Sequence, residues 1–247
     1  MFWTILAYFV AIAIGIHDFN IKQFGWTLVT FVSNNWFKLS YLGLFMFAPV
    51  LESFVEKSTQ RQLGCFIVAF YLFSTLFGWI LQASPEFREG CTFVSLSGLY
   101  LIGAYTRRYD LNVLRFNKWI DLALYLGIGF LLVILSVIAL NLGITSSLYG
   151  YLNPLVIIES VYLFLFFRKL DIGYSRLVNW IAASAFAAYL FHVNASLYGT
   201  YQDICRGIQD WFEYPFPVAV AFIIGVFAVA VVVDKLRLWS FNAMYRK

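Results

Sequence analysis

Long runs of apolar side chains recur along the chain, and short polar segments separate them. A transmembrane helix needs about 20 apolar residues, or somewhat fewer where the bilayer is thin. Eight segments meet this requirement, and we expect each of them to cross the membrane as a helix. They are approximately Phe2–Ile16, Trp36–Val55, Leu63–Leu81, Thr92–Tyr105, Ile120–Leu140, Leu152–Phe167, Leu177–Val193 and Phe216–Val233. A further apolar piece, Phe24–Val32, has the length of a re-entrant segment.

The composition agrees with this pattern. Of the 247 residues, 62% are hydrophobic and only 12% are charged, whereas soluble domains carry about 25% charged residues. This small number of charged residues cannot cover a water-soluble surface. We therefore expect lipid to surround most of the protein. The sequence therefore predicts an all-α, polytopic integral membrane bundle of about eight helices, in one domain over residues 1–247.

The basic residues fall mainly in every second gap between the apolar runs. Cytoplasmic loops of membrane proteins hold the excess of Lys and Arg, so these gaps should face the cytoplasm. With eight crossings, both termini are then cytoplasmic. Thirteen of the seventeen basic residues lie in this set: Lys57, Arg61, Arg107, Arg108, Arg115, Lys118, Arg168, Lys169, Arg176, Lys235, Arg237, Arg246 and Lys247. Because they sit at membrane edges rather than in one stripe, we expect no nucleic-acid partner.

Tryptophans and cysteines fit the same topology. Indole rings favour the headgroup level, and Trp3, Trp119, Trp180 and Trp239 fall near predicted inner ends, the other four near outer ends. Cys91 and Cys205 both belong to predicted outward loops. They are either two unpaired thiols or, in an oxidising compartment, a disulfide. No Cys or His spacing matches a metal motif, so we expect no metal.

Candidate chemistry lies in a few polar residues at membrane depth or at its edges. Glu159 is near the middle of the sixth predicted span and either lines a cavity or pairs inside the bundle. His192 closes the seventh span, where its imidazole either acts as a base or simply ends a helix. Asn34, Asn35 and Tyr41 offer amide and hydroxyl groups at the predicted outer face.

The predicted inner end of the fourth span carries a second candidate set. Gly98 and Gly103 are small enough to let another helix approach closely. Arg107 and Arg108 follow at the membrane edge, where paired guanidinium groups either bind phosphates or only set the topology.

Several motifs together resemble the membrane-bound acyltransferase-3 superfamily, and the chain is particularly similar to bacterial O-acetyltransferases that modify surface polysaccharides. They extend from about Asn34 to Asn194, and their order and spacing carry the resemblance. They are Asn34-Asn35-Trp36-Phe37 followed by Tyr41 and Pro49, the segment from Tyr100 to Tyr109, Asn153-Pro154-Leu155, the run Phe166-Phe167-Arg168-Lys169-Leu170, and the run from Ala188 to Val193.

This resemblance implies transfer of an acyl group, usually acetyl, from cytoplasmic acyl-CoA (acetyl-CoA) to a hydroxyl of a glycan or lipid-linked oligosaccharide beyond the bacterial inner membrane. It implies acceptor-side roles for Asn34, Asn35, Trp36, Tyr41 and His192. It implies donor-side roles for Gly103, Arg107 and Arg108.

The chain departs from the family pattern at its start. The family's first helix carries an Arg or Lys eleven residues before the catalytic His, but Leu6 stands eleven residues before His17 and Ile181 eleven before His192. We therefore expect that the family's first two helices are missing, and we assign the catalytic role to no residue. Three hypotheses follow: a partial or divergent O-acyltransferase, a non-catalytic protein that binds or passes a lipid-linked glycan, and a truncated gene product.

Overall fold

The structure is a computed structural model that describes all residues except 34, 85, 88–89, 110–114, 144–147 and 246–247. The described residues form helices joined by turns and loops, and none of them lies in a strand. The expected all-α fold is confirmed. The chain divides into two compact units, residues 36–171 and residues 1–35 with 172–247. The expectation of one domain over the whole chain stays a prediction.

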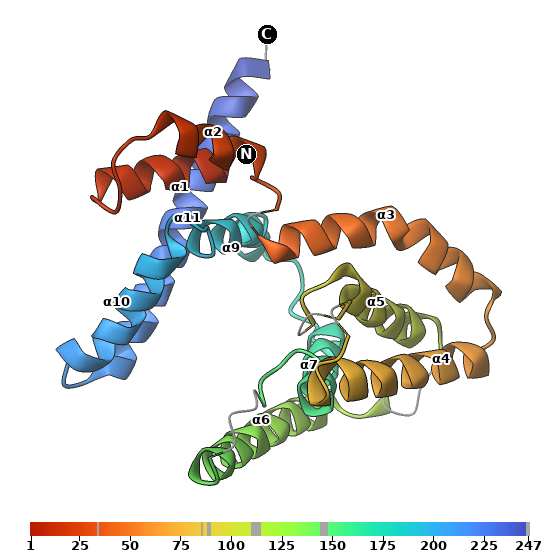
Figure 1. Ribbon diagram of the computed structural model, residues 1–247. Helices are drawn as coiled ribbons and strands as arrows, with labels where there is room; N and C mark the ends of the chain where they lie inside the picture. The colour runs from red at the N-terminus through yellow and green to blue at the C-terminus, as the bar shows by residue number, and fades with distance from the viewer. Residues whose placement is uncertain (34, 85, 88–89, 110–114, 144–147, 246–247) are drawn as a thin grey trace. The chain divides into compact units, whose positions relative to one another are not determined.

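The unit of residues 36–171 is built from helices. It contains α3 (Trp36–Lys57), α4 (Gln60–Phe73), the π-helix η1 (Ser74–Ile80), α5 (Phe93–Arg108), α6 (Lys118–Asn141) and α7 (Pro154–Lys169). Helix α5 packs against both α3 and α4, and α6 packs along α7 (Figure 1). The predicted inner ends of α3 and α5 thereby lie side by side.

Local sequence signals explain where several of these helices begin. Thr59 and Gln62 form a capping box, each side chain bonding the backbone of the other, so α4 starts directly after the turn that ends α3. The side chain of Asn153 accepts a hydrogen bond from the N–H of Leu155 at the start of α7, and Pro154 occupies the first helical position. This is the Asn-Pro-Leu motif of the sequence.

The long pairing of α6 with α7 is fixed at one end by a buried ion pair. Asp121 is completely buried, and Lys169 donates to its Oδ2 over 2.6 Å. The same ammonium group also donates to the carbonyl of Phe116. A buried carboxylate needs such a partner because desolvation of an isolated charge costs several kcal/mol.

The unit of residues 1–35 and 172–247 centres on one long helix. It contains α1 (Phe2–Ala13), α2 (Ile21–Val29), α8 (Arg176–Ala182), α9 (Ala185–His192), α10 (Tyr198–Trp211) and α11 (Pro215–Tyr245). Helices α9 and α10 pack against α11, and α1 packs against α2 and α9. The side chains of Ala7, Ala11 and Leu197 form a small buried cluster with Val10 and Phe191 around it.

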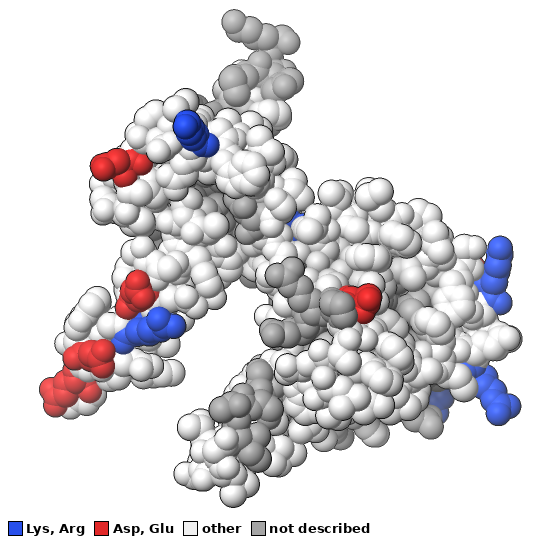
Figure 2. Space-filling model, viewed as in Figure 1, with Lys and Arg blue, Asp and Glu red and all other residues white. Residues whose placement is uncertain are grey.

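Among the described residues, four helices are long and apolar enough to cross a membrane, which indicates an integral membrane protein. They are Trp36–Lys57, Gln60–Ile80, Lys118–Asn141 and Pro215–Ala243. Only 6 to 17% of each apolar window is buried, so large apolar side chains face outward and suit lipid. Figure 2 shows the same property, because most of the visible surface carries neither acidic nor basic residues. Eight crossings and cytoplasmic termini stay predictions.

The seventh expected span is interrupted. Instead of one helix over Leu177–Val193, the chain forms α8 and α9 with a turn at Ala183 and Ser184. Neither piece has the length of a bilayer crossing. The expected re-entrant piece, Phe24–Val32, largely coincides with α2, which begins at Ile21 because the side chain of Asn20 caps its first turn.

Candidate functional site

The unit that contains α9 gathers polar and aromatic side chains around His192. The imidazole Nδ1 lies 2.9 Å from the carbonyl oxygen of Ala188, one turn earlier in the same helix. A carbonyl can only accept, so Nδ1 carries the proton in this bond. In the neutral imidazole the other nitrogen, Nε2, is then the one with a lone pair. That is the form of histidine that can remove a proton from a hydroxyl group.

Two tyrosines enclose this imidazole. The ring of Tyr201 from α10 lies 5.5 Å from it between centroids, and the ring of Tyr189 meets it edge-on at 5.9 Å. Tyr201 in turn stacks on Phe222 of α11. Burial raises the pKa of Tyr201, and the neighbouring Cys205 raises it further. Tyr201 therefore keeps its phenolic proton at neutral pH.

Asn35 joins this group through Tyr189. The hydroxyl of Tyr189 donates to Oδ1 of Asn35 over 3.3 Å, across a sequence separation of 154 residues. Asn35 is largely buried, so its amide is held in a defined position. Two of the expected acceptor-side residues, Asn35 and His192, are thereby linked through one tyrosine. We call Asn35, Tyr189, His192 and Tyr201 the His192 cluster.

The other acceptor-side candidates are placed differently. Trp36 and Tyr41 both contact Phe37, at ring-centroid distances of 5.7 and 6.0 Å, and they belong to α3 in the other unit. Trp36 also contacts Tyr151. Asn34 lies outside the described residues. The aromatic surface of Trp36 and Tyr41 therefore belongs to the first turns of α3, and both side chains are exposed.

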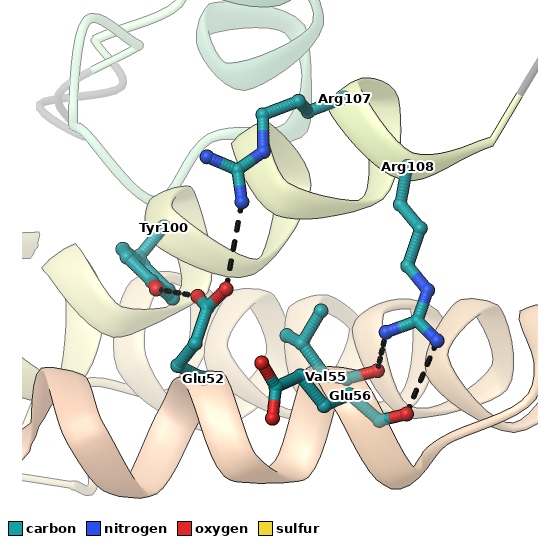
Figure 3. Close-up of polar contacts among 6 residues, drawn as sticks. All are labelled: Glu52, Val55, Glu56, Tyr100, Arg107 and Arg108. Carbon is teal, nitrogen blue, oxygen red and sulfur yellow. Dashed lines mark hydrogen bonds and ion pairs between the residues drawn. The ribbon is translucent and has the colours of Figure 1, made fainter.

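The donor-side candidates gather where α5 passes the end of α3, as Figure 3 shows. Arg107 Nη2 lies 3.4 Å from Glu52 Oε1, and the hydroxyl of Tyr100 donates to the other oxygen of the same carboxylate. The side chain of Arg107 is 79% exposed, so most of the guanidinium group is accessible. Glu52 holds Arg107 on one side only, which leaves its remaining N–H groups open to a phosphate.

Arg108 has a different role from its neighbour. Its Nη1 donates to the carbonyl of Val55 over 2.5 Å, and its Nη2 donates to the carbonyl of Glu56 over 3.1 Å (Figure 3). These carbonyls belong to the last turn of α3, where backbone acceptors have no partner within the helix. Arg108 therefore ties α5 to the end of α3, and of the two arginines Arg107 is the one available for a ligand.

The two glycines of α5 also differ. A Cβ atom on Gly98 would run into the ring of Phe70 on α4, so the expected close approach occurs there. A Cβ atom on Gly103 would meet nothing within 4 Å in the described part of the chain. Gly103 instead contributes its carbonyl, which accepts from the hydroxyl of Thr106.

Glu159 points at the neighbouring helix. Its Oε1 would lie 2.9 Å from a Cβ built on Gly129, so the absence of a side chain there makes room for the carboxylate between α7 and α6. Among the described residues, no donor is bonded to this carboxylate. The cysteines Cys65, Cys91 and Cys205 form no disulfide in this structure.

No protein-family model matches the chain, and no characterised protein or solved structure matches it significantly. The resemblance to acyltransferases thus depends on the quoted motifs alone. Sequence reasoning missed Glu52, Tyr189 and Tyr201 as parts of these clusters. Glu52 did have a signal, because it is the first carboxylate within the run that starts at Trp36. Tyr201 had none, since α10 was not expected.

Proposed function

We propose that this integral membrane protein is an O-acyltransferase. It moves an acyl group, most simply acetyl, from acyl-CoA in the cytoplasm to a hydroxyl group of a cell-surface glycan or lipid-linked oligosaccharide. The single observation that carries the proposal is the hydrogen bond between His192 Nδ1 and the Ala188 carbonyl. It fixes the tautomer in which Nε2 is free to act as a general base.

The chemistry assigned to this histidine is conventional for acyl transfer. Nε2 of His192 removes the proton from the acceptor hydroxyl as its oxygen attacks the thioester carbonyl. A carbon–oxygen bond forms, the carbon–sulfur bond breaks, and the proton passes to the sulfur of the departing CoA. The ring of Tyr201 lies beside the imidazole, and the pair Tyr189 and Asn35 supplies groups that can bind sugar hydroxyls.

The donor side is assigned to Arg107. CoA carries phosphate groups, and an exposed guanidinium group held by Glu52 offers N–H donors of matching geometry. Arg107 lies in the last turn of α5, at the membrane edge that the excess of Lys and Arg assigns to the cytoplasm, which is where acyl-CoA is made. The corresponding location is the bacterial cytoplasmic membrane.

A transfer assay with membranes of an expressing strain tests this function. Labelled acetyl-CoA is added to inverted vesicles that contain the full chain, and the label is measured in the glycan and lipid-linked oligosaccharide fractions. We expect His192→Gln to lower the transfer rate by about 10²- to 10⁴-fold, the usual contribution of a general base. The matched control is His17→Gln, which changes the other histidine of the chain and should retain activity.

The proposal fails if wild-type chain transfers no label to any acceptor fraction, or if His192→Gln transfers it as fast as wild type. A second function then has support from the same cluster, namely binding of a glycan without chemistry. Two tyrosine rings and an amide around one imidazole offer hydrogen bonds and flat apolar faces, which suit a sugar ring. A glycan-dependent rise in Tm without turnover would identify that function.

A further inference from the structure

A pocket of about 340 Å³ opens in the unit that contains α11, and none of the residues that line it is assigned to acyl transfer. The apolar part of its wall comes from α1 and α9. Its polar part comes from two residues on successive turns of α11. The residues used below are Phe2, Trp3, Phe186, Leu190, Asp234 and Arg237. We call this cavity the Asp234 pocket.

The pocket lies where an apolar run ends. Asp234 follows the run Phe216–Val233 directly, so it marks the edge of the part of α11 that can lie in hydrocarbon. Trp3 lines the pocket, and Trp239 follows Asp234 by five residues, or about 7.5 Å along the helix. The ammonium group of Lys235 lies 4.6 Å from the ring centre of Trp180 on α8. Indole rings and lysines concentrate at the headgroup level of a bilayer, which places the pocket at that level.

Two opposite charges meet in the pocket, and each has an unused atom. Asp234 is only 3% exposed. Nε of Arg237 donates a hydrogen bond to Oδ1 over 2.9 Å, and Nη2 makes an ion-pair contact with the same oxygen, also at 2.9 Å. In the part of the chain that the structure describes, Oδ2 of Asp234 has no donor and Nη1 of Arg237 has no acceptor. The guanidinium group also lies over the ring of Phe2, at 5.8 Å.

The contacts of Arg237 are distributed unequally over the two oxygens of the Asp234 carboxylate, which a purely structural ion pair does not require. A bidentate contact between Asp and Arg uses both carboxylate oxygens, whereas here the hydrogen bond and the ion-pair contact both go to one oxygen. The result is one free acceptor with negative charge beside one free donor with positive charge. A ligand that carries a cation with N–H groups and an anion, a short distance apart, satisfies both atoms and matches both charges.

We propose that the Asp234 pocket binds the headgroup of a phosphatidylethanolamine molecule. The primary ammonium donates to Oδ2 of Asp234, and the phosphate accepts from Nη1 of Arg237. The apolar side chains Phe2, Phe186 and Leu190 then face the start of the lipid chains. A phosphatidylcholine headgroup has no N–H to donate, and an anionic phosphatidylglycerol headgroup brings no cation to the carboxylate. This site is independent of the proposed acyl transfer.

Binding of short-chain lipids to the purified full chain tests the proposal, with native mass spectrometry or a titration of tryptophan fluorescence as the readout. We expect dihexanoyl phosphatidylethanolamine to bind about tenfold more tightly than the corresponding phosphatidylcholine or phosphatidylglycerol, a difference of about 1.4 kcal/mol. Asp234→Asn should remove this preference. The matched control is Asp203→Asn, which changes the acid of an exposed pair with Arg206 on α10, 3.8 Å apart, and should leave the preference intact.

Asp234 is buried and its replacement can destabilise the fold, so a series of lipids on wild-type protein gives a second test. Affinity should fall stepwise from the ethanolamine headgroup through its N-methyl and N,N-dimethyl forms to choline, as N–H donors are replaced by methyl groups. Equal affinity along the series overturns the proposal. So does phosphatidylglycerol binding as tightly as phosphatidylethanolamine, or a folded Asp234→Asn variant that keeps the preference.

Discussion

Neighbouring residues with the same chemistry have different functions in this protein, and Arg107 and Arg108 are the clearest pair. Both end α5, and both were candidates for a phosphate ligand. The guanidinium group of Arg108 is engaged by two backbone carbonyls of α3, whereas that of Arg107 has one carboxylate partner and is mostly exposed. The pair therefore separates into one residue that stabilises the fold and one that can bind a ligand.

Replacement of these arginines should affect stability unequally. Arg108→Gln removes two charge-assisted hydrogen bonds and leaves carbonyls at the end of α3 without a protein partner, so we expect a loss of about 1 to 2 kcal/mol in the free energy of unfolding. Arg107→Gln removes an exposed ion pair and should cost less than about 0.5 kcal/mol. Thermal unfolding of the two purified variants in the same detergent compares them. Equal Tm values would show that the carbonyl contacts do not stabilise the protein.

The sequence indicated that most of these residues lie at the ends of apolar segments, but it did not indicate which residues they contact. The motif around Asn35 and the run that ends at His192 were both recognised as polar positions at the ends of apolar segments, and they are indeed in one cluster. Their link runs through Tyr189, 154 residues from Asn35, and no local pattern encodes a contact over that distance. Glu52 likewise gains its role from Tyr100 and Arg107, which only the packing of α5 on α3 brings near.

At the level of helices, the close contact of α4 and α5 depends on a single small residue. Gly98 faces the ring of Phe70, and that ring also lies against Phe66 and Phe87, so it has little space to move. Gly103, five residues further along α5, faces open space. The two glycines therefore provide a matched pair for a test of helix packing.

Alanine at these two positions should have opposite effects. Gly98→Ala inserts a methyl group into a filled space, and such overpacking costs about 1 to 3 kcal/mol, which exceeds the gain of about 0.5 to 1 kcal/mol from replacing glycine within a helix. Gly103→Ala should show that gain alone. Tm in detergent measures both, and Gly98 would lose its assigned role if its alanine variant were as stable as that of Gly103.

Helix boundaries were predictable where an apolar run coincides with a helix. The predicted spans Trp36–Val55 and Ile120–Leu140 correspond to α3 and α6 within two residues at each end. The last two residues of α3 are charged, so hydropathy leaves them out. The break in the seventh span has no such signal, because Ala183 and Ser184 are neither Gly nor Pro. Ser184 is completely buried there, so tertiary packing rather than local preference sets the turn.

For the whole molecule, composition and the order of apolar runs were enough to predict an all-α membrane protein. The number of crossings was harder, because α5 and α7 are 16 residues long and the first apolar helix is 12 residues long. Helices of this length span a bilayer only where it thins or where their flanking residues extend the crossing. Only the distribution of Lys and Arg among the loops therefore supports an even number of membrane crossings.

Labelling of single cysteines tests that topology directly. In a chain whose three native cysteines are replaced by serine, a cysteine at Gln60 should react with an impermeant maleimide only in inverted vesicles. A cysteine at Ala195 should react only in intact cells. Both positions are exposed and lie at helix ends, so reactivity reports the compartment. Labelling of both from one side would rule out the assignment of Arg107 to the cytoplasm and of His192 to the outer face.

Helix α11 also defines a length that the surrounding lipid must match. Between Glu213 and Asp234 the chain has about 20 residues without a charge, which as a helix measure about 30 Å, close to the hydrocarbon thickness of an ordinary bilayer. Asp234 is paired with Arg237 and buried against its own unit, so that end cannot slide into hydrocarbon. In a thicker membrane, α11 has no further apolar residues that could lengthen its crossing. The lipids around it must compress instead, and the protein should accumulate in thinner regions of the membrane.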